Sequence, residues 1–113
     1  MEYQILNESE AIERVFDKDL LKELLTDFSQ MKELDWDVFD NHLKNGNMNE
    51  LEHISHSIKG VSGNLSLIGI YKTSTNLNNA VRQNNLTAAA EYFEDLKKEV
   101  ARFRDFLPEY LNS

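Results

Sequence analysis

Residues 89–110 read "AAEYFEDLKKEVARFRDFLPEY" and carry a buried-type side chain at alternating steps of four and three. These positions are Ala89, Phe93, Leu96, Val100, Phe103, Leu107 and Tyr110. Because an α-helix turns once in about 3.6 residues, side chains spaced in this way form one stripe along a helix. Pro108 lies near the end of the stretch, where we expect a kink or a stop. The stretch therefore predicts a long amphipathic helix whose apolar face is covered by other elements.

The N-terminal part of the chain predicts three shorter helices. The first is expected after Ser9, its N-cap, and the second near Asp17. The third is expected to begin at the cap Asp35 and to close near Gly46. Their apolar residues are, in order, Ile12, Val15 and Phe16; Leu20, Leu21, Leu24, Leu25, Phe28 and Met31; and Trp36, Phe39 and Leu43.

Two further helices are expected between these elements and the final one, which should begin near Asn85. Asn47 is expected to cap the first, with Glu50 three residues later in a capping-box arrangement, and this helix covers residues 48–64. The second runs from Ser66 to about Asn84. Its inward positions are spaced four, three and four apart: Ile70, Ser74, Leu77 and Val81.

These helices together predict the fold class. Four long amphipathic helices joined by short turns favour an all-α, antiparallel, up-down-up-down four-helix bundle, with one or two additional N-terminal helices packed across it. Strand signals are scarce, because no alternating run rich in Val, Ile and Thr occurs. A chain of 113 residues suits one hydrophobic core and is too short for two ordinary domains. We therefore expect residues 1–113 to form a single domain.

Composition narrows the classes of function. The formal net charge is -8, which argues against nucleic acid and anionic membranes as partners, since both attract clustered Lys and Arg. The chain has no Cys, which excludes disulfides, thiolate metal sites and Cys nucleophiles. It shows neither a signal-peptide pattern nor the roughly 18 consecutive apolar residues of a membrane span. We expect a soluble, cytoplasmic, monomeric protein whose partners are proteins.

The stretch "HISHSIKGVSG", residues 53–63, carries the candidate chemistry. On a helical wheel of about 100° per residue, six residues of this helix share one arc of about 100°, and His56 lies roughly opposite its centre. The residues of the buried arc are Leu51, Ile54, Ile58, Val61, Ser62 and Leu65. His56 is therefore expected to point into solvent from the middle of the helix.

Gly60 and Gly63 are placed on the same exposed side as His56. A glycine in an exposed helix interior costs about 0.8–1 kcal/mol relative to Ala, so the pair needs another explanation. A glycine leaves the neighbouring surface uncovered, which allows a macromolecule to approach the imidazole closely. Lys59 lies three residues after His56 and can place its ammonium near an anion bound to that ring.

An exposed imidazole with a nearby cation and an open approach suits reversible phosphorylation. A free imidazole has a pKa of about 6.5, so at neutral pH it is largely unprotonated and a ring nitrogen can attack phosphorus without an activating base. The charge on the transferring phosphoryl group is offset by a lysine such as Lys59. The sequence thus indicates a phosphoryl carrier centred on His56.

The run "HSIKGVSGNLSLIGIYKTSTNLNNAVRQNN", residues 56–85, resembles the histidine phosphotransfer (HPt) domains of bacterial and plant phosphorelays. The hallmark of these domains is His-x-x-Lys-Gly followed by a small residue and a glycine. The match covers His56, Lys59, Gly60 and Gly63 in order, and the layout of helices extends it over almost the whole chain. It continues through Leu65, Leu77, Ala80 and Arg82.

The resemblance implies roles for these residues and partners for the chain. His56 would be the phospho-acceptor and Lys59 would assist the phosphate, while a docking surface would include Gly60, Gly63, His53, Asn64, Asn78 and Arg82. The partners would be response-regulator receiver domains and a hybrid sensor kinase. No cofactor is expected on this chain, because the receiver would supply Mg²⁺ and the Asp. Both a free-standing carrier and the C-terminal domain of a hybrid sensor kinase fit the sequence.

Two positions depart from the family pattern. Ser66 follows the "GNL" element at a position where the family often has Gly, and we explain this serine as the N-cap of the next helix. Asn78 stands where the family often has Glu, which removes a charge and bears on the choice of partner.

Three other functions fit the sequence less well than a phosphoryl carrier. A kinase is not expected, because the chain lacks a Gly-rich nucleotide loop and a domain to hold ATP. A helical adaptor that binds without phosphotransfer would need neither His56 nor Lys59. A metal-binding bundle would need more inward-facing ligands, and the pair of His53 and His56 is a weak metal signal.

Overall fold

The computed structural model describes residues 2–113, which form six α-helices and one short 3-10 helix. The elements are α1 (Glu8–Val15), α2 (Lys18–Ser29), η1 (Lys32–Leu34), α3 (Trp36–Asn45), α4 (Met48–Asn64), α5 (Ile68–Arg82) and α6 (Leu86–Leu111). These residues contain no β-strand, so the predicted all-α class is confirmed. None of the helices that they form is both long and apolar enough to span a membrane.

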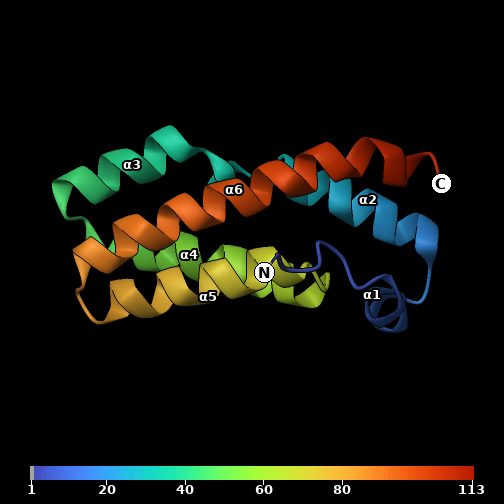
Figure 1. Cartoon of the computed structure of the whole chain (residues 1–113), viewed down its shortest axis with the longest axis horizontal. Coiled ribbons are helices and arrows are strands. Elements are labelled where there is room, and N and C mark those ends of the chain that lie inside the picture. Colours follow the sequence, from blue (N-terminus) through green and yellow to red (C-terminus); the bar gives the residue numbers. More distant parts are fainter. Residues whose placement is uncertain (1) are drawn as a thin grey trace.

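The helices α3, α4, α5 and the first part of α6 run side by side in alternating directions and form the four-helix bundle (Figure 1). The remaining length of α6 packs against α2, which continues the line of α3. Helix α1 lies beyond the end of α4 and the start of α5 (Figure 1). We expected the N-terminal helices to cross the bundle, and α2 instead runs alongside α6. The 26 residues of α6, about 39 Å of helix, set the long axis of a molecule that measures 42 × 23 × 23 Å.

The stripe predicted on α6 is the centre of the core. All seven of its residues are buried, and they belong to one apolar core to which every α-helix contributes at least one residue. The helix continues through Pro108 to Leu111, so the predicted stop is wrong. Proline in the last turn of a helix removes a single backbone hydrogen bond. Burial of Leu107 and Tyr110 on either side of it holds this turn in place.

Several predicted helix ends are confirmed. The carboxylates of Asp17 and Asp35 accept backbone N–H groups in the first turns of α2 and α3, and Asn85 caps α6 by accepting the N–H of Ala88. Gly46 ends α3 with a φ of 66°, a left-handed conformation that glycine adopts without strain.

Two predicted capping bonds are absent because other groups make bonds in their place. Ser9 lies inside α1, which begins earlier because Asn7 accepts the N–H of Glu10. Asn47 is the N-cap residue of α4, as predicted, but its side chain makes no bond to the helix, since its amide lies 3.0 Å from Nδ1 of His42. Phe16 was also misplaced: it is the C-cap of α1 and is 87% exposed, not part of a buried stripe.

The start of α5 is capped from a distant part of the chain. The N–H groups of Ile68 and Gly69 donate to the carbonyls of Ile5 and Gln4, both at 3.2 Å. These bonds satisfy backbone donors that a helix leaves unpaired at its first turn. The predicted N-cap Ser66 is therefore wrong, and α5 begins at Ile68 instead.

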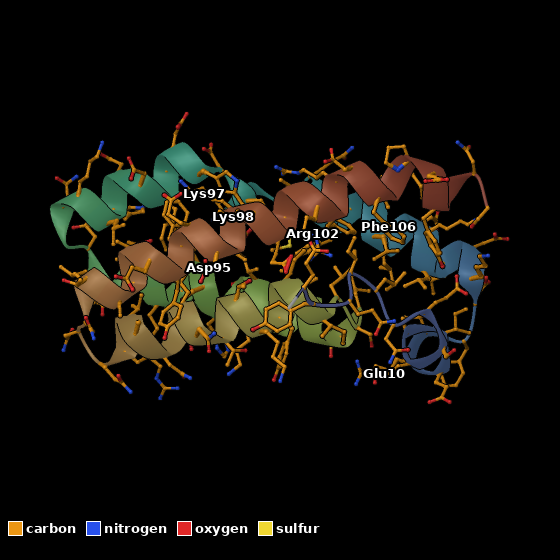
Figure 2. The ribbon with its side chains drawn as sticks, in the orientation of Figure 1. Glu10, Asp95, Lys97, Lys98, Arg102 and Phe106 are labelled. Carbon is orange, nitrogen blue, oxygen red and sulfur yellow. The ribbon has the colours of Figure 1, made fainter. Side chains whose placement is uncertain are left out.

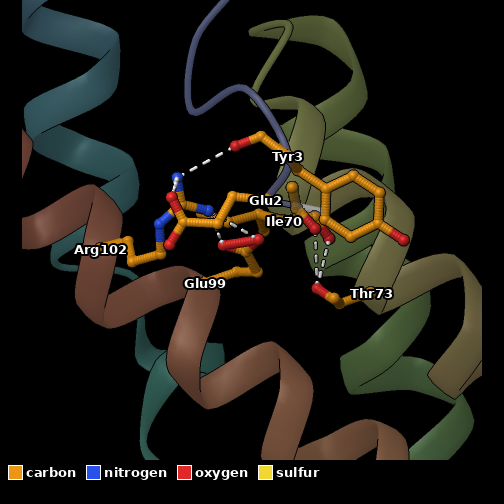
Figure 3. Close-up of polar contacts among 7 residues, drawn as sticks. Glu2, Tyr3, Ile70, Thr73, Glu99 and Arg102 are labelled. Carbon is orange, nitrogen blue, oxygen red and sulfur yellow. Dashed lines mark hydrogen bonds and ion pairs between the residues drawn. The ribbon is translucent and has the colours of Figure 1, made fainter.

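The N-terminal segment is also tied to α6 (Figure 3). The Arg102 guanidinium donates to the carbonyl of Tyr3 at 3.0 Å and pairs with the Glu99 carboxylate at 2.6 Å. A Cβ added at Gly69 would lie 2.7 Å from Oε1 of Glu99. Glycine at this position therefore allows α5 to approach the ion pair on α6.

Tyr110 joins the end of α6 to α1 and makes stability sensitive to alkaline pH. Its hydroxyl donates to Oε2 of Glu8 at 2.5 Å, and burial together with this bond raises the pKa of Tyr110 above its ordinary value. The raised pKa contributes stability below the unfolded-state pKa of about 10, and that stability is lost as the pH rises beyond it. Above about pH 10, we expect the free energy of unfolding in urea to fall more steeply for wild type than for Tyr110→Phe.

The matched control for this prediction is Tyr92→Phe, since Tyr92 forms no hydrogen bond among residues 2–113. That variant should retain the alkaline loss of stability seen in wild type. If the free energy of unfolding depended on pH equally in wild type and Tyr110→Phe, the Glu8 contact would not hold the phenol in its neutral form.

Candidate functional site

The helical wheel correctly predicted which face of α4 is buried. Five of the six residues assigned to that face are buried, and Val61 at its margin is half-buried. Ser55 and Ser62 fit within the helix packing because their hydroxyls donate to α4 carbonyls, those of Leu51 and Lys59. His56 is exposed, as predicted. No hydrogen bond within residues 2–113 involves its ring, so both ring nitrogens are open to solvent or a partner.

His56 lines a hollow of about 620 Å³, which we call the His56 hollow. Lys59, Gly60, Gly63 and Asn64 line it from α4, and the other walls come from α1 and α5. Residues of those walls that the sequence did not indicate include Glu10, Arg14, Tyr71 and Lys72. Only the packing of α1 and α5 against the end of α4 brings them here, and no local pattern in the sequence marks them.

Lys59 is the unpaired cation closest in sequence to His56. It is half-buried, and none of the ion pairs among residues 2–113 includes it. Its charge is therefore not neutralised by a carboxylate of this chain. An anion held at the imidazole would find an available ammonium group.

The two glycines of α4 serve different purposes. A Cβ added at Gly60 meets no atom within 4 Å, which confirms that Gly60 leaves the surface open. A Cβ added at Gly63 would lie 3.0 Å from the ring of Tyr71. The role predicted for Gly63 is thus wrong, because Gly63 lets a side chain of α5 pack closely on α4 and does not keep this surface bare.

A polar cluster fixes α1 at the edge of the hollow. The Arg14 guanidinium donates to the Gly63 carbonyl at 2.5 Å and to the Ser66 hydroxyl at 2.9 Å, and it pairs with Glu10 at 3.0 Å. The Ser66 hydroxyl donates to Glu10 at 2.8 Å, and Figure 2 shows Glu10 on α1 at this end of the bundle. Ser66 is buried with a φ of 54°, so its hydrogen bonds hold a backbone conformation that glycine would adopt more easily.

Of the predicted docking residues, three more are exposed and one is not. His53, Asn64 and Arg82 are exposed, and Nε of Arg82 lies 3.8 Å from Oε1 of Glu52. Asn78 is only 1% exposed, which contradicts its assignment to the docking surface.

Asn78 is buried because it faces α4 across the interface between the two helices. Its amide donates to the Ser55 hydroxyl at 2.9 Å and to the Glu52 carbonyl at 3.3 Å, while its Oδ1 has no partner within residues 2–113. A contact of this kind orients α4 and α5 relative to each other. Asn78 therefore acts within the protein and is shielded from partners.

A helical bundle that displays a histidine with an unpaired lysine and an uncovered glycine has the form of a phosphoryl-carrier domain. The family model described as "Hpt domain" matches residues 10–106. The match covers most of the 113 residues, and the chain belongs to the Hpt domain family. It is thus a histidine phosphotransfer carrier of two-component phosphorelays and not a kinase. Comparisons with curated proteins and with solved structures found no match.

Proposed function

We propose that His56 is the residue that carries the phosphoryl group. It receives phosphate from the Asp of one receiver domain and passes it to the Asp of a response regulator. The observation that carries this assignment is the placement of His56, exposed and without a hydrogen bond, in a hollow that also contains Lys59 and Gly60. His42 and His53 do not line this hollow.

The proposed transfer exchanges a P–O bond for a P–N bond. A lone pair on the unprotonated imidazole attacks the phosphorus of the aspartyl phosphate, and the Asp carboxylate departs with the electrons of the broken P–O bond. Transfer to the next receiver is the reverse exchange. Lys59 offsets charge on the equatorial phosphoryl oxygens, and the receiver supplies Mg²⁺ and the Asp.

The surface around His56 is the proposed docking site for receivers. It includes Gly60 and Gly63, and the exposed side chains His53, Asn64 and Arg82 extend it along α4 and α5. Residues 1–113 act in this proposal as a single domain and as a monomer. The donor receiver belongs to a hybrid sensor kinase, and the domain itself is free-standing or part of such a kinase.

Phosphate transfer from a receiver tests the proposal. The protein is incubated with a phosphorylated receiver domain and Mg²⁺, and protein-bound phosphate is then tested for stability in acid and base. Phosphohistidine is expected, which is labile in acid and stable in base. Failure of several different receivers to label the chain would contradict the carrier assignment.

Gly60 provides a second test, in which one variant probes stability and another probes transfer. Because nothing lies within 4 Å of an added Cβ, Gly60→Ala should raise the free energy of unfolding by about 0.5–1 kcal/mol. Gly60→Glu should also fold, but its carboxylate lies one turn from His56, where it repels the phosphoryl group and obstructs the approach of the receiver. We expect transfer to slow by at least about tenfold.

Urea unfolding and rapid-quench transfer kinetics measure these two effects. Thr87→Glu is the matched control, since it adds the same charge at an exposed position in the first turn of α6. It should transfer at the wild-type rate. Normal transfer by Gly60→Glu would show that an open surface at Gly60 is not needed.

A further inference from the structure

An apolar groove lies next to the His56 hollow. It has a volume of about 660 Å³ and is formed by the end of α1, by α2 and by the C-terminal turns of α4. Its apolar lining includes Phe16, Leu24, Met31, Val61 and Leu65. Arg14 and Asn64 line both this apolar groove and the His56 hollow, so the two form one continuous surface.

Phe16 is the unusual residue of the apolar groove. Its side chain is 87% exposed, and its backbone has a φ of 68°, where α1 ends with the Phe16 N–H donating to the carbonyl of Ile12. A bulky side chain in the left-handed region is strained, and glycine or asparagine would be more favourable there. Exposure and strain at one residue contribute nothing to the stability of this chain, which indicates a role toward a partner.

We propose that a receiver domain docked at His56 extends across Arg14 and Asn64 and places apolar side chains in the apolar groove, with Phe16 as the anchor. This inference rests on the proposed function, since it assigns a further part of the same docking surface. The partner is a receiver domain that carries exposed apolar side chains beside its phosphorylated Asp.

The dimensions of the surface agree with this arrangement. From His56 to Asn64 the helix rises about 12 Å. A transient interface that covers about 600 Å² on each partner is roughly 25 Å across, which spans both the His56 hollow and the apolar groove.

The chemistry of the neighbouring surface gives the direction in which the receiver extends. Toward the start of α4 the exposed side chains are polar or charged, among them Asn49, Glu50 and Glu52. The centre of a protein interface is poor in charged residues and rich in aromatic ones. The apolar centre of this interface therefore lies toward α1 and Phe16.

A second copy of the chain is a less suitable occupant of the apolar groove. Each copy has a net charge of -8, and two such copies repel each other. A receiver is also held at this surface by its reaction with His56, whereas a second copy has no such reason to bind here.

Phe16→Asn tests the inference, because Asn tolerates the left-handed conformation but removes the aromatic ring. The control is Leu86→Asn, which removes a large apolar side chain that is 41% exposed in the first turn of α6. Two phosphoryl donors are compared: a receiver domain that labels the wild-type chain, and phosphoramidate, a small donor that needs no docking surface. The thermal midpoint and the sedimentation of each variant are measured as well.

We expect Phe16→Asn to slow transfer from the receiver about 30-fold, as loss of an aromatic anchor does, with phosphoramidate labelling unchanged. Its thermal midpoint should equal or exceed that of wild type, and Leu86→Asn should transfer normally. Normal receiver transfer by Phe16→Asn would overturn the inference alone, and so would equal slowing with both donors. A wild-type dimer that Phe16→Asn dissociates without slowing transfer would assign the apolar groove to a second copy. No labelling of wild type by any donor would overturn the proposed function and this inference with it.

Discussion

His56→Gln is expected to abolish phosphate incorporation from a phosphorylated receiver, by a factor of at least about 10³. The amide nitrogen of glutamine has no available lone pair, because it is delocalised into the carbonyl, so the P–N bond cannot form. The fold should be unaffected, since His56 is exposed and its ring makes no hydrogen bond within residues 2–113. Labelling with a radioactive phosphoryl donor and circular dichroism measure the two properties.

The chain provides a matched control for this variant on the same helix. His53 is also exposed but does not line the His56 hollow, so His53→Gln should retain most of the labelling. Loss of labelling in His53→Gln with retention in His56→Gln would move the phosphorylation site one turn toward the start of α4. Equal labelling of both variants would place it elsewhere.

Asn78→Asp is expected to cause a large loss of stability at neutral pH. Both groups that face the Asn78 amide are acceptors, the Glu52 carbonyl and the Ser55 hydroxyl, whose hydrogen is donated to Leu51. A carboxylate at this site would be buried without a donor or a cation. Such an unpaired buried charge lowers the free energy of unfolding by about 3–5 kcal/mol.

The loss of stability in Asn78→Asp should increase with pH. Burial raises the folded-state pKa of the new carboxyl above its unfolded value of about 3.9, because burial favours the neutral form. The variant is therefore destabilised progressively as the pH rises from about 4, and it recovers stability in acid, where the protonated carboxyl can donate to the Glu52 carbonyl. Urea unfolding at about pH 4.5 and pH 7 measures the difference.

Asn79→Asp is the control, because Asn79 is the exposed neighbour of Asn78. It adds the same charge to the same helix, and its stability should stay within about 0.5 kcal/mol of wild type at both pH values. Equal stabilities of the two variants at neutral pH would contradict the burial of Asn78 between α4 and α5.

Periodicity alone was sufficient to predict the helices and much of the core. The seven-residue rhythm of α6 correctly identified every buried position of that stripe, because one continuous contact face imposes one repeat. The caps Asp17, Asp35 and Asn85 were predictable for a similar reason, since each cap bonds within its own helix. The side-chain bonds of Asn47 and Ser66 could not be predicted in this way, because they reach outside the helix start. Asn47 bonds to His42, and Ser66 bonds to Glu10 and Arg14.

The sequence by itself determined that this protein is all-α, that His56 faces solvent and that Gly60 lies beside it. Each of these follows from the spacing of residues along a single helix, where 3.6 residues per turn fix the direction of every side chain. The tertiary structure alone decided that Asn78 is buried, that Tyr71 covers Gly63 and that Arg14 joins the surface around His56. These depend on how one helix packs against another, because contacts between residues far apart in the chain leave no periodic pattern in the sequence.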